Sequence, residues 1–294
     1  MMPLKTDPID ARRAAFRKLH GEGCFVIPNP WDVGSARYLQ ALGFQALATT
    51  SSGFAFSRGL PDAGSAVPRD VALSHFAEIV AGSGLPINAD YQFGYAHEPE
   101  SVFTNVQLCA QTGVAGLSIE DATGDSSRPL YELPLAVDRI RAARAALDEC
   151  APDVLLTARA ECFLVGRPEP LKESIERLQA YAAAGADVLY APGPSKAEDI
   201  KAIVAAAHPK PVNVLMLSNT GLRVSDLAKM GVRRISVGSA LARAAWTGFI
   251  RAARAIAEEG SFEGLGGAIS FAELNGFFRK DLEDRRAGPT HQKS

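Results

Sequence analysis

The chain has 294 residues, of which 47% are hydrophobic and 22% charged, and its formal net charge is −2. This composition is typical of a folded globular protein, and without a block of basic residues it argues against a nucleic-acid partner. The four cysteines are widely spaced with no CxxC pair, which argues against a disulfide framework or a structural zinc site. No apolar run is long enough to span a membrane and the N-terminus has no secretory apolar segment, so we expect a cytoplasmic protein.

Along the chain, short apolar runs alternate with longer segments that have one apolar face. Helices are predicted over residues 9–20, 33–42, 69–82, 98–112, 134–149, 170–184, 196–207, 223–230 and 239–258. Strands are predicted over residues 24–27, 44–49, 86–89, 116–119, 154–158, 188–191, 212–216 and 234–237. Together these elements make eight units in which a strand is followed by a helix.

Glycines mark the ends of four of these helices. Gly43, Gly113, Gly185 and Gly231 each follow a helix rich in alanine or leucine and come directly before an apolar run. A glycine at this position can adopt the left-handed conformation that ends a helix. The pattern therefore predicts four helix-to-strand junctions.

Eight such units in about 250 residues predict an α/β protein with a (β/α)₈ TIM barrel. A doubly wound open sheet is the alternative, although no GxGxxG dinucleotide-binding motif follows a strand. We expect residues 1–259 to form the catalytic barrel and residues 260–294 to be a C-terminal helical extension of the same domain. The extension is rich in aromatic residues, which would pack on its own barrel or, as we prefer, against a second subunit.

The stretch from Pro86 to Tyr95 carries a short buried strand into polar residues, among them Asp90 and Gln92. In parallel α/β proteins ligands bind at the C-terminal ends of strands, so these side chains are expected to point into a site. A strand end closed by an Asx-turn is the alternative interpretation of this segment taken alone. The same transition from apolar to polar residues recurs at 49–53, 118–121 and 157–161.

The residues at these strand ends have the chemistry of a metal and carboxylate site. Asp90, Gln92 and Glu120 offer hard oxygen atoms, which suit Mg²⁺ or Mn²⁺ rather than zinc. Arg159 presents a planar fork to a carboxylate or phosphonate, although it could instead pair with Glu120 or Glu161. The same face is expected to carry the backbone N–H groups of Ser52 and Gly53, which could hold an anion, and the side chains of Asp62, Tyr190 and Asn213.

Seven segments carry a resemblance to a known family: NPWDVGSARYLQALGF (29–44), TTSSGFA (49–55), GLPDAG (59–64), NADYQFGYA (88–96), GLSIEDATG (116–124), TARAE (157–161) and GADVLYAPG (185–193). In these segments the chain resembles the isocitrate lyase and phosphoenolpyruvate mutase superfamily, and within it the methylisocitrate lyases. The resemblance implies a (β/α)₈ barrel that binds Mg²⁺ and makes or breaks a C–C or P–C bond beside the carbonyl of a 2-oxo acid. It also implies a homo-oligomer, either a dimer or a tetramer that exchanges its eighth helix between subunits.

The same resemblance implies roles for individual residues. The metal ion would bridge the 2-oxo and carboxylate oxygens of the substrate and stabilise the enolate formed when the bond breaks. Asp90 would hold the ion, with Glu120 and Asp62 reaching it through water. In this scheme the metal-binding residues are Asp90, Gln92 and Glu120, the catalytic residues are Arg159, Glu120 and Asp62, and the substrate-binding residues are Ser52, Gly53, Arg159, Asn213 and Tyr190.

Three departures limit what the resemblance implies. The isocitrate and methylisocitrate lyases carry a KKCGH-type loop after the fourth strand, whereas residues 121–128 contain neither cysteine nor lysine. The mutase-type loop with lysine and asparagine is also missing. Gln92 stands where the family usually has an acid, which removes a negative charge near the metal and should weaken Mg²⁺ binding.

Three functions follow as hypotheses. The first is a Mg²⁺-dependent lyase that acts on a small 2-oxo or 2-hydroxy di- or tricarboxylic acid, with the loop 121–132 as a lid that brings in Arg128. The second is a phosphoenolpyruvate mutase or phosphonopyruvate-type enzyme, and the third is a barrel that binds a 2-oxo acid without converting it. The proton donor of the first stays open between Tyr190 and a metal-bound water.

Overall fold

The computed structural model describes residues 8–64 and 66–287, which form two compact units that divide between residues 242 and 243. The first unit contains the barrel strands β1 (Phe25–Ile27), β2 (Leu47–Ala48), β3 (Ile87–Asp90), β4 (Gly116–Glu120), β5 (Leu155–Arg159), β6 (Val188–Tyr190), β7 (Val212–Leu215) and β8 (Arg234–Ser236). Its helices are α1 (Pro8–Gly21), α2 (Val33–Ala41), α3 (Ser51–Ser57), α4 (Arg69–Gly82), α5 (Pro99–Gln111), α6 (Leu133–Cys150), α7 (Pro170–Ala183), α8 (Ala197–Ala207), α9 (Val224–Lys229) and the start of α10 (Ala240–Glu259).

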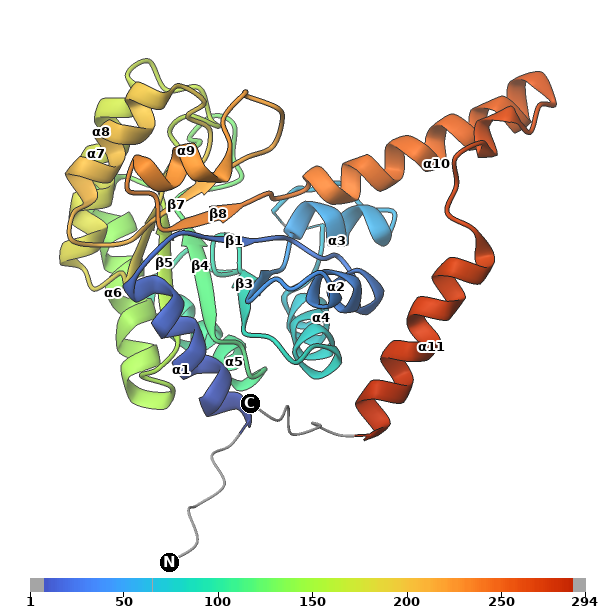
Figure 1. Ribbon diagram of the computed structural model, residues 1–294. Helices are drawn as coiled ribbons and strands as arrows, with labels where there is room; N and C mark the ends of the chain where they lie inside the picture. The colour runs from blue at the N-terminus through green and yellow to red at the C-terminus, as the bar shows by residue number, and fades with distance from the viewer. Residues whose placement is uncertain (1–7, 65, 288–294) are drawn as a thin grey trace, which may run out of the picture. The chain divides into compact units, whose positions relative to one another are not determined.

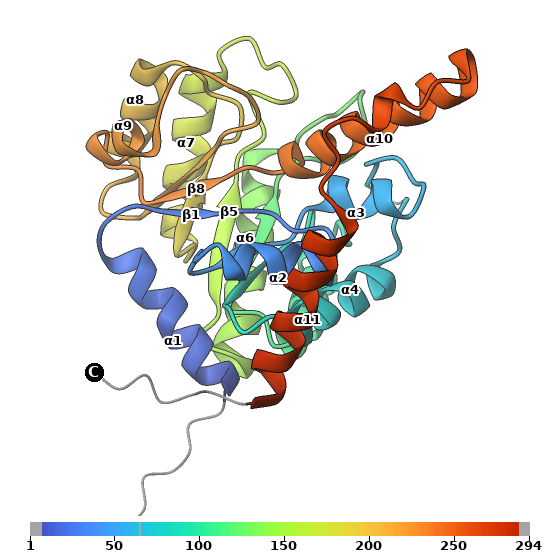
Figure 2. The ribbon, with the colours of Figure 1, turned by 45° about the vertical axis from the view of Figure 1, so that its right-hand side comes forward.

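The eight strands form a nearly closed parallel barrel, which confirms the predicted fold. Their hydrogen-bonded order is β1-β8-β7-β6-β5-β4-β3-β2. Between β1 and β2, the ends of this order, the N–H of Ala48 donates to the carbonyl of Pro28 at 3.0 Å. Figure 1 shows the strands in the middle, with α7 and α8 on one side and α2 and α4 on the other, and Figure 2 shows β1 and β8 side by side. The alternative of an open sheet is therefore wrong.

The strands have one apolar face and one polar face. In β4, Leu117 and Ile119 belong to the apolar core shared with the helices, whereas Ser118 and Glu120 line a cavity inside the barrel. This alternation follows from the two-residue period of a strand. TIM barrels are usually filled by branched apolar side chains, but here the inner face of the other strands carries Asn88, Asp90, Arg159, Tyr190, Asn213, Arg234 and Ser236.

The helices agree with the sequence signals with one exception. The four junction glycines have positive φ values, +87° at Gly43, +86° at Gly113, +102° at Gly185 and +86° at Gly231, as a left-handed helix end requires. The exception is α3, which the sequence did not predict. It begins directly after β2, and its N-cap is Thr50.

The second unit consists of most of α10, the 3₁₀-helix η1 (Glu263–Leu265) and α11 (Phe271–Ala287). The predicted extension is thus helical, and the unit begins before residue 259 because α10 belongs mainly to it. The assignment of residues 1–259 and 260–294 to a catalytic part and an extension stays a prediction, as does helix exchange between subunits. None of the helices in the described ranges is both long and apolar enough to cross a membrane.

Candidate active site

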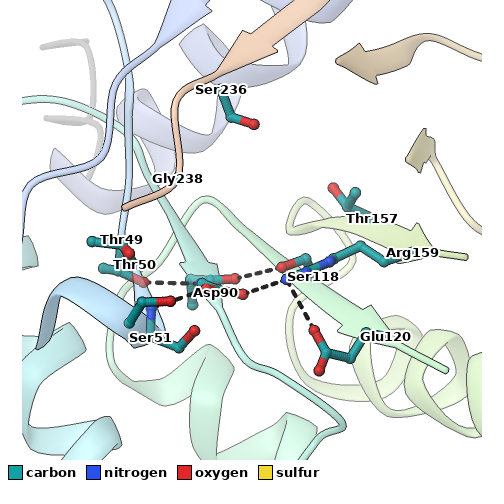
Figure 3. Close-up of polar contacts among 12 residues, drawn as sticks. Thr49, Thr50, Ser51, Asp90, Ser118, Glu120, Thr157, Arg159, Ser236 and Gly238 are labelled. Atoms are coloured by element: carbon teal, nitrogen blue, oxygen red, sulfur yellow. Dashed lines mark hydrogen bonds and ion pairs between the residues drawn. The ribbon is translucent and has the colours of Figure 1, made fainter. Parts of the chain in front are cut away.

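A cavity of about 490 Å³ lies inside the barrel at the C-terminal ends of the strands. Figure 3 shows that its polar side chains come from separate strands and from the start of α3. Gly53 is the predicted site residue that does not line it. The convergence expected from the strand ends is present, since the cavity is lined by Ser52, Asp62, Asp90, Gln92, Glu120, Arg159, Glu161, Tyr190 and Asn213.

Arg159, at the end of β5, lies among three carboxylates. Its Nη1 is 2.8 Å from Oδ1 of Asp90 and 3.0 Å from Oε2 of Glu120 (Figure 3). Its Nη2 is 2.8 Å from Oε1 of Glu161. Because Asp90 and Glu120 contact the same nitrogen, their carboxylates face one point. The pairing of Arg159 with Glu120 and Glu161, which the sequence left open, is confirmed, and Asp90 joins it.

Burial and like charges control the ionisation of this cluster. Burial raises the pKa of Glu120 and of Glu161, although Arg159 lowers both. Burial would lower the pKa of Arg159, but the three carboxylates around it raise the pKa well above its usual value. Burial also raises the pKa of Asp62. The cavity thus holds four acidic side chains against two arginines, Arg159 and Arg234, and a further cation would stabilise the charged forms of the acids.

Asp90 is fixed at the end of β3 by its neighbours. Its N–H donates to Oγ1 of Thr49 at 2.9 Å, and its Oδ2 accepts a hydrogen bond from the N–H of Ser51 at 3.0 Å. Oδ1 accepts the bond from Arg159 at 2.8 Å. A carboxylate offers about four lone-pair positions, so both oxygens keep acceptor capacity for a ligand in the cavity.

Gln92 has two unusual features. Its φ of +48° lies in the left-handed region, which residues with a side chain seldom adopt. Its side chain is buried, and Oε1 has no hydrogen-bond partner in the described structure. A buried acceptor without a partner is costly unless water or a ligand occupies it. The oxygen that the sequence placed in the metal-binding set is therefore available for that purpose.

The first turn of α3 already uses some of its N–H groups. The N–H of Gly53 donates to Oγ1 of Thr50 at 3.1 Å, and the hydroxyl of Ser52 donates to Oδ2 of Asp62. Anion binding by the N–H of Gly53 would require it to leave its cap. The roles predicted for Ser52 and Gly53 in substrate binding stay predictions.

Asp121 follows Glu120 in the chain but belongs to a buried network outside the cavity lining. Its Oδ2 accepts a hydrogen bond from the hydroxyl of Tyr181 at 2.6 Å and lies 3.1 Å from Nη1 of Arg177. Its Oδ1 accepts from the N–H of Glu161 at 2.9 Å. This network fixes the backbone that presents Glu161 to Arg159.

Sequence reasoning missed two cavity residues in β8, Arg234 and Ser236. Both belong to the inner face, whereas Ile235 between them packs into the apolar core. The alternation of polar and apolar residues in this strand is a signal that could have found them. The neighbouring Arg233 obscured it, because paired arginines at the start of a strand are usually solvated.

The family model for phosphoenolpyruvate phosphomutase matches residues 16–257 of this chain. The chain belongs to this family. Its relatives include lyases and mutases of the isocitrate lyase and phosphoenolpyruvate mutase superfamily, so the resemblance seen in the sequence motifs is confirmed.

Three comparisons show how close the phosphoenolpyruvate mutase relatives are. A solved structure of a candidate lyase/mutase from Burkholderia cenocepacia J2315 is 46% identical, has a TM-score of 0.88, and matches over 93% of this chain and 98% of its own. The 2-methylisocitrate lyase of Escherichia coli strain K12 is 34% identical over 62% of this chain and 61% of its own length. A structure of oxaloacetate acetylhydrolase in complex with its product oxalate is 27% identical, has a TM-score of 0.82, and matches over 96% of this chain and 100% of its own.

The loop 121–132, which departs from the superfamily pattern in sequence, is ordered by contacts of its own. Ala122 and Leu130 form an antiparallel bridge, and Ser127 donates its N–H and its hydroxyl to Oδ1 of Asp125 at 2.8 and 2.7 Å. The side chain of Arg128 is exposed, and its Nε lies 3.9 Å from Oδ2 of Asp125. The loop contains neither a cysteine nor a lysine.

The donor set of the cavity fits a hard, hydrated cation. Within residues 8–64 and 66–287, no three His, Cys, Asp or Glu side chains are placed to hold a metal ion directly. Mg²⁺ usually keeps several waters and binds one or two carboxylates. Asp90 offers such a carboxylate, with oxygens of Asp62, Gln92 and Glu120 lining the same cavity.

Proposed function

We propose that this member of the phosphoenolpyruvate mutase family is a divalent-cation-dependent lyase. It would make or break a C–C bond beside the carbonyl of a small 2-oxo or 2-hydroxy di- or tricarboxylic acid. The observation that carries the proposal is the convergence of Asp90, Glu120 and Glu161 on one guanidinium at the C-terminal end of the barrel. The named acids of the relatives, methylisocitrate and oxaloacetate, support the substrate class.

We propose Mg²⁺ as the cofactor, with Mn²⁺ as the alternative. Asp90 would bind the ion directly, and Glu120 and Asp62 would hold its waters. Oε1 of Gln92 would add a neutral oxygen to this set, at a lower affinity than an acid would give. When bound, such a cation supplies positive charge beside the 2-oxo oxygen, where negative charge develops as the neighbouring bond breaks.

The residues of the chain would orient the substrate. Arg159 would bind its carboxylate through the planar guanidinium, at the expense of contacts with the surrounding acids. Arg159 stays positively charged, because the surrounding acids raise its pKa. The raised pKa values of Glu120 and Asp62 suit them to take up a proton from a substrate hydroxyl. Closure of the loop 121–132 would exclude water from the reacting atoms.

A second candidate function is the cleavage or formation of a P–C bond in a phosphonopyruvate-type substrate. The match of the phosphoenolpyruvate phosphomutase model over residues 16–257 favours it. The guanidinium of Arg159 could bind a phosphonate as it binds a carboxylate. The missing lysine and asparagine in the loop after β4 count against this second function.

We also propose that the enzyme acts as a homo-oligomer, a dimer or a tetramer. The second unit exposes large apolar side chains, which is unusual for a surface that stays in water. Light scattering of the purified protein would give the oligomer size, and a monomer would refute the proposal. The exposed side chains are Trp246, Phe249, Ile250, Ile256, Phe262, Leu265, Ile269, Phe271, Leu274, Phe278 and Leu282.

A substrate screen tests the lyase proposal. Oxaloacetate, methylisocitrate, 2,3-dimethylmalate and phosphonopyruvate would be incubated with Mg²⁺, and the release of pyruvate, oxalate and phosphate would be followed. We expect at least one of the three acids without phosphorus to be cleaved by the wild type and by Asp138→Ala, which alters an exposed helical residue. Asp90→Ala should cleave none of them. Turnover that survives Asp90→Ala would refute the metal role. Turnover of phosphonopyruvate alone would favour the second function, and metal-dependent oxalate binding without turnover would indicate a binding protein.

A further inference from the structure

Arg234 is a buried cation without an acid partner. It lies on the inner face of β8, is 3% exposed, and forms no ion pair with any residue that the structure describes. Its Nε donates to Oδ1 of Asn213 at 2.9 Å and its Nη2 donates to Oγ1 of Thr157 at 3.0 Å, both neutral acceptors. Burial lowers its pKa to about 10, so it remains charged at neutral pH. A charge kept at this cost needs a reason beyond packing.

Arg234 fixes the direction of a chain of hydrogen bonds across three strands. An arginine only donates, so the atom of Asn213 that faces Arg234 must be its oxygen. The amide nitrogen of Asn213 then points the other way and donates to Oγ of Ser236 at 2.9 Å. Because Ser236 accepts this bond, its own hydroxyl proton is available to donate. Ser236 and Tyr190 line the same cavity, and a hydrogen bond from Ser236 lowers the pKa of the Tyr190 phenol.

The last group in this chain of hydrogen bonds is the hydroxyl of Tyr190. Tyr190 pairs in register with Arg159 on one side and with Asn213 on the other, and the guanidinium carbon of Arg159 lies 5.2 Å from the centre of its ring. A phenol oxygen that accepts a hydrogen bond from Ser236 leaves its own O–H free to donate into the cavity that Arg159 also lines. Burial raises the pKa of Tyr190 to about 12, while Arg159 and Ser236 lower it and so stabilise the phenolate.

We propose that Tyr190 is the proton donor of the lyase reaction and that Arg234, Asn213 and Ser236 are positioning residues that aim its hydroxyl at the substrate. The proposal rests on the proposed lyase function. When the C–C bond breaks, its electron pair stays with the fragment that carries the carbonyl and gives an enolate. The other fragment leaves either as CO₂ from a carboxylate or as a carbonyl compound whose hydroxyl proton passes to Glu120 or Asp62. The proton of Tyr190 then passes to the enolate carbon, and the phenolate takes a proton from water. This assigns the proton donor that the sequence left open between Tyr190 and a metal-bound water.

Proton exchange tests the donor role. The enzyme would be incubated with pyruvate and Mg²⁺ in D₂O, and loss of the methyl proton signal would be followed by NMR. Tyr190→Phe should slow the exchange by about 10²–10⁴-fold, while it still binds oxalate. Exchange at the wild-type rate in Tyr190→Phe, or loss of its oxalate binding, would overturn the donor role.

Three variants test the positioning chain in the same assay. Ser236→Ala should slow exchange on the order of tenfold, whereas Ser236→Thr keeps the hydroxyl and should stay close to the wild-type rate. Asn213→Asp has nearly the same shape and pairs with Arg234, but it accepts where the amide donated. It should therefore draw the proton of Ser236 away from Tyr190 and slow exchange as Ser236→Ala does. Unchanged exchange in Ser236→Ala and Asn213→Asp would overturn the chain.

A measurement without substrate separates this proposal from the lyase function. With 3-fluorotyrosine in place of the six tyrosines, the ¹⁹F signal missing from Tyr190→Phe belongs to position 190. Fluorine acidifies the phenol and moves its titration to a lower pH, and circular dichroism over the same pH range would show that the protein stays folded. The titration midpoint should rise in Ser236→Ala and not in Ser236→Thr, and equal midpoints would overturn the hydrogen bond. If the midpoint rises but no acid is cleaved or exchanged, the lyase function and the donor role fall while the hydrogen-bonded chain stands.

Discussion

Replacement of Arg159 by methionine tests the acidic cluster, because it removes the guanidinium and keeps a side chain of similar length. Arg159 contacts three carboxylates at 2.8, 3.0 and 2.8 Å, and its side chain is 14% exposed. Removal of one partner of a buried ion pair costs about 3–5 kcal/mol, since the remaining charge stays buried without compensation. We therefore expect Arg159→Met to lower the free energy of unfolding at pH 8 by about 3–5 kcal/mol.

Urea unfolding in EDTA, followed by circular dichroism, measures this loss. The loss should shrink as the pH falls, because burial raises the pKa of Glu120 and Glu161 above their unfolded values. Such groups bind protons more readily in the folded chain than in the unfolded chain. The free energy lost by burying them without Arg159 therefore declines as the pH falls and they become neutral. Arg159→Lys keeps the charge and should lose less. A loss below about 1 kcal/mol at pH 8, the value for an exposed pair, would refute the buried cluster.

Three further substitutions test other parts of the protein by urea unfolding. Asp121→Asn removes the acid of a buried ion pair and should cost about 3–5 kcal/mol, whereas the exposed Asp138→Asn should cost less than about 1 kcal/mol; equal costs would contradict the network. Burial lowers the pKa of His75 from 6.5 to about 4, so its contribution to stability is lost as the pH falls through this range. His75→Phe should therefore reduce the fall in unfolding free energy between pH 7 and pH 4 by about 3 kcal/mol, and an unchanged pH dependence would argue against its burial. Gly116→Ala would place a Cβ 2.8 Å from a neighbouring side-chain oxygen and should lower the free energy of unfolding by about 1–3 kcal/mol. Gly248→Ala meets open space in α10 and should raise the free energy of unfolding by about 0.5–1 kcal/mol. An unchanged stability of Gly116→Ala would show that the neighbouring side chain can move aside.

The barrel could be predicted because its signals are local. Gly43 and the three glycines like it end helices through their own backbone conformation, and each strand is an apolar run of a few residues. Helix α3 gave no such signal. Its first residues are serines and a glycine, which have modest or low helix propensity, and its cap, Thr50, lies within the polar segment that also ends β2.

The site could be predicted in part. Asp90 and Glu120 end strands, and parallel strands bring such residues together whatever the details of packing. Arg234 could not be found from a strand end, because it begins β8. Only the alternation of polar and apolar residues in that strand points to it, and its acceptors come from β5 and β7, far from it in the chain. The left-handed backbone of Gln92 was equally hidden, since glutamine has no preference for that conformation.

Titration of oxalate tests the central claim, that Asp90 and its neighbouring carboxylates hold a divalent cation through which a 2-oxo acid binds. Oxalate resembles the enolate of pyruvate in charge and shape, and isothermal calorimetry measures its binding directly. We predict binding to the wild type and to Asp138→Ala in Mg²⁺, and loss of binding in EDTA or in Asp90→Ala. Oxalate that binds equally well in EDTA or to Asp90→Ala, or that does not bind the wild type in Mg²⁺, would contradict the claim.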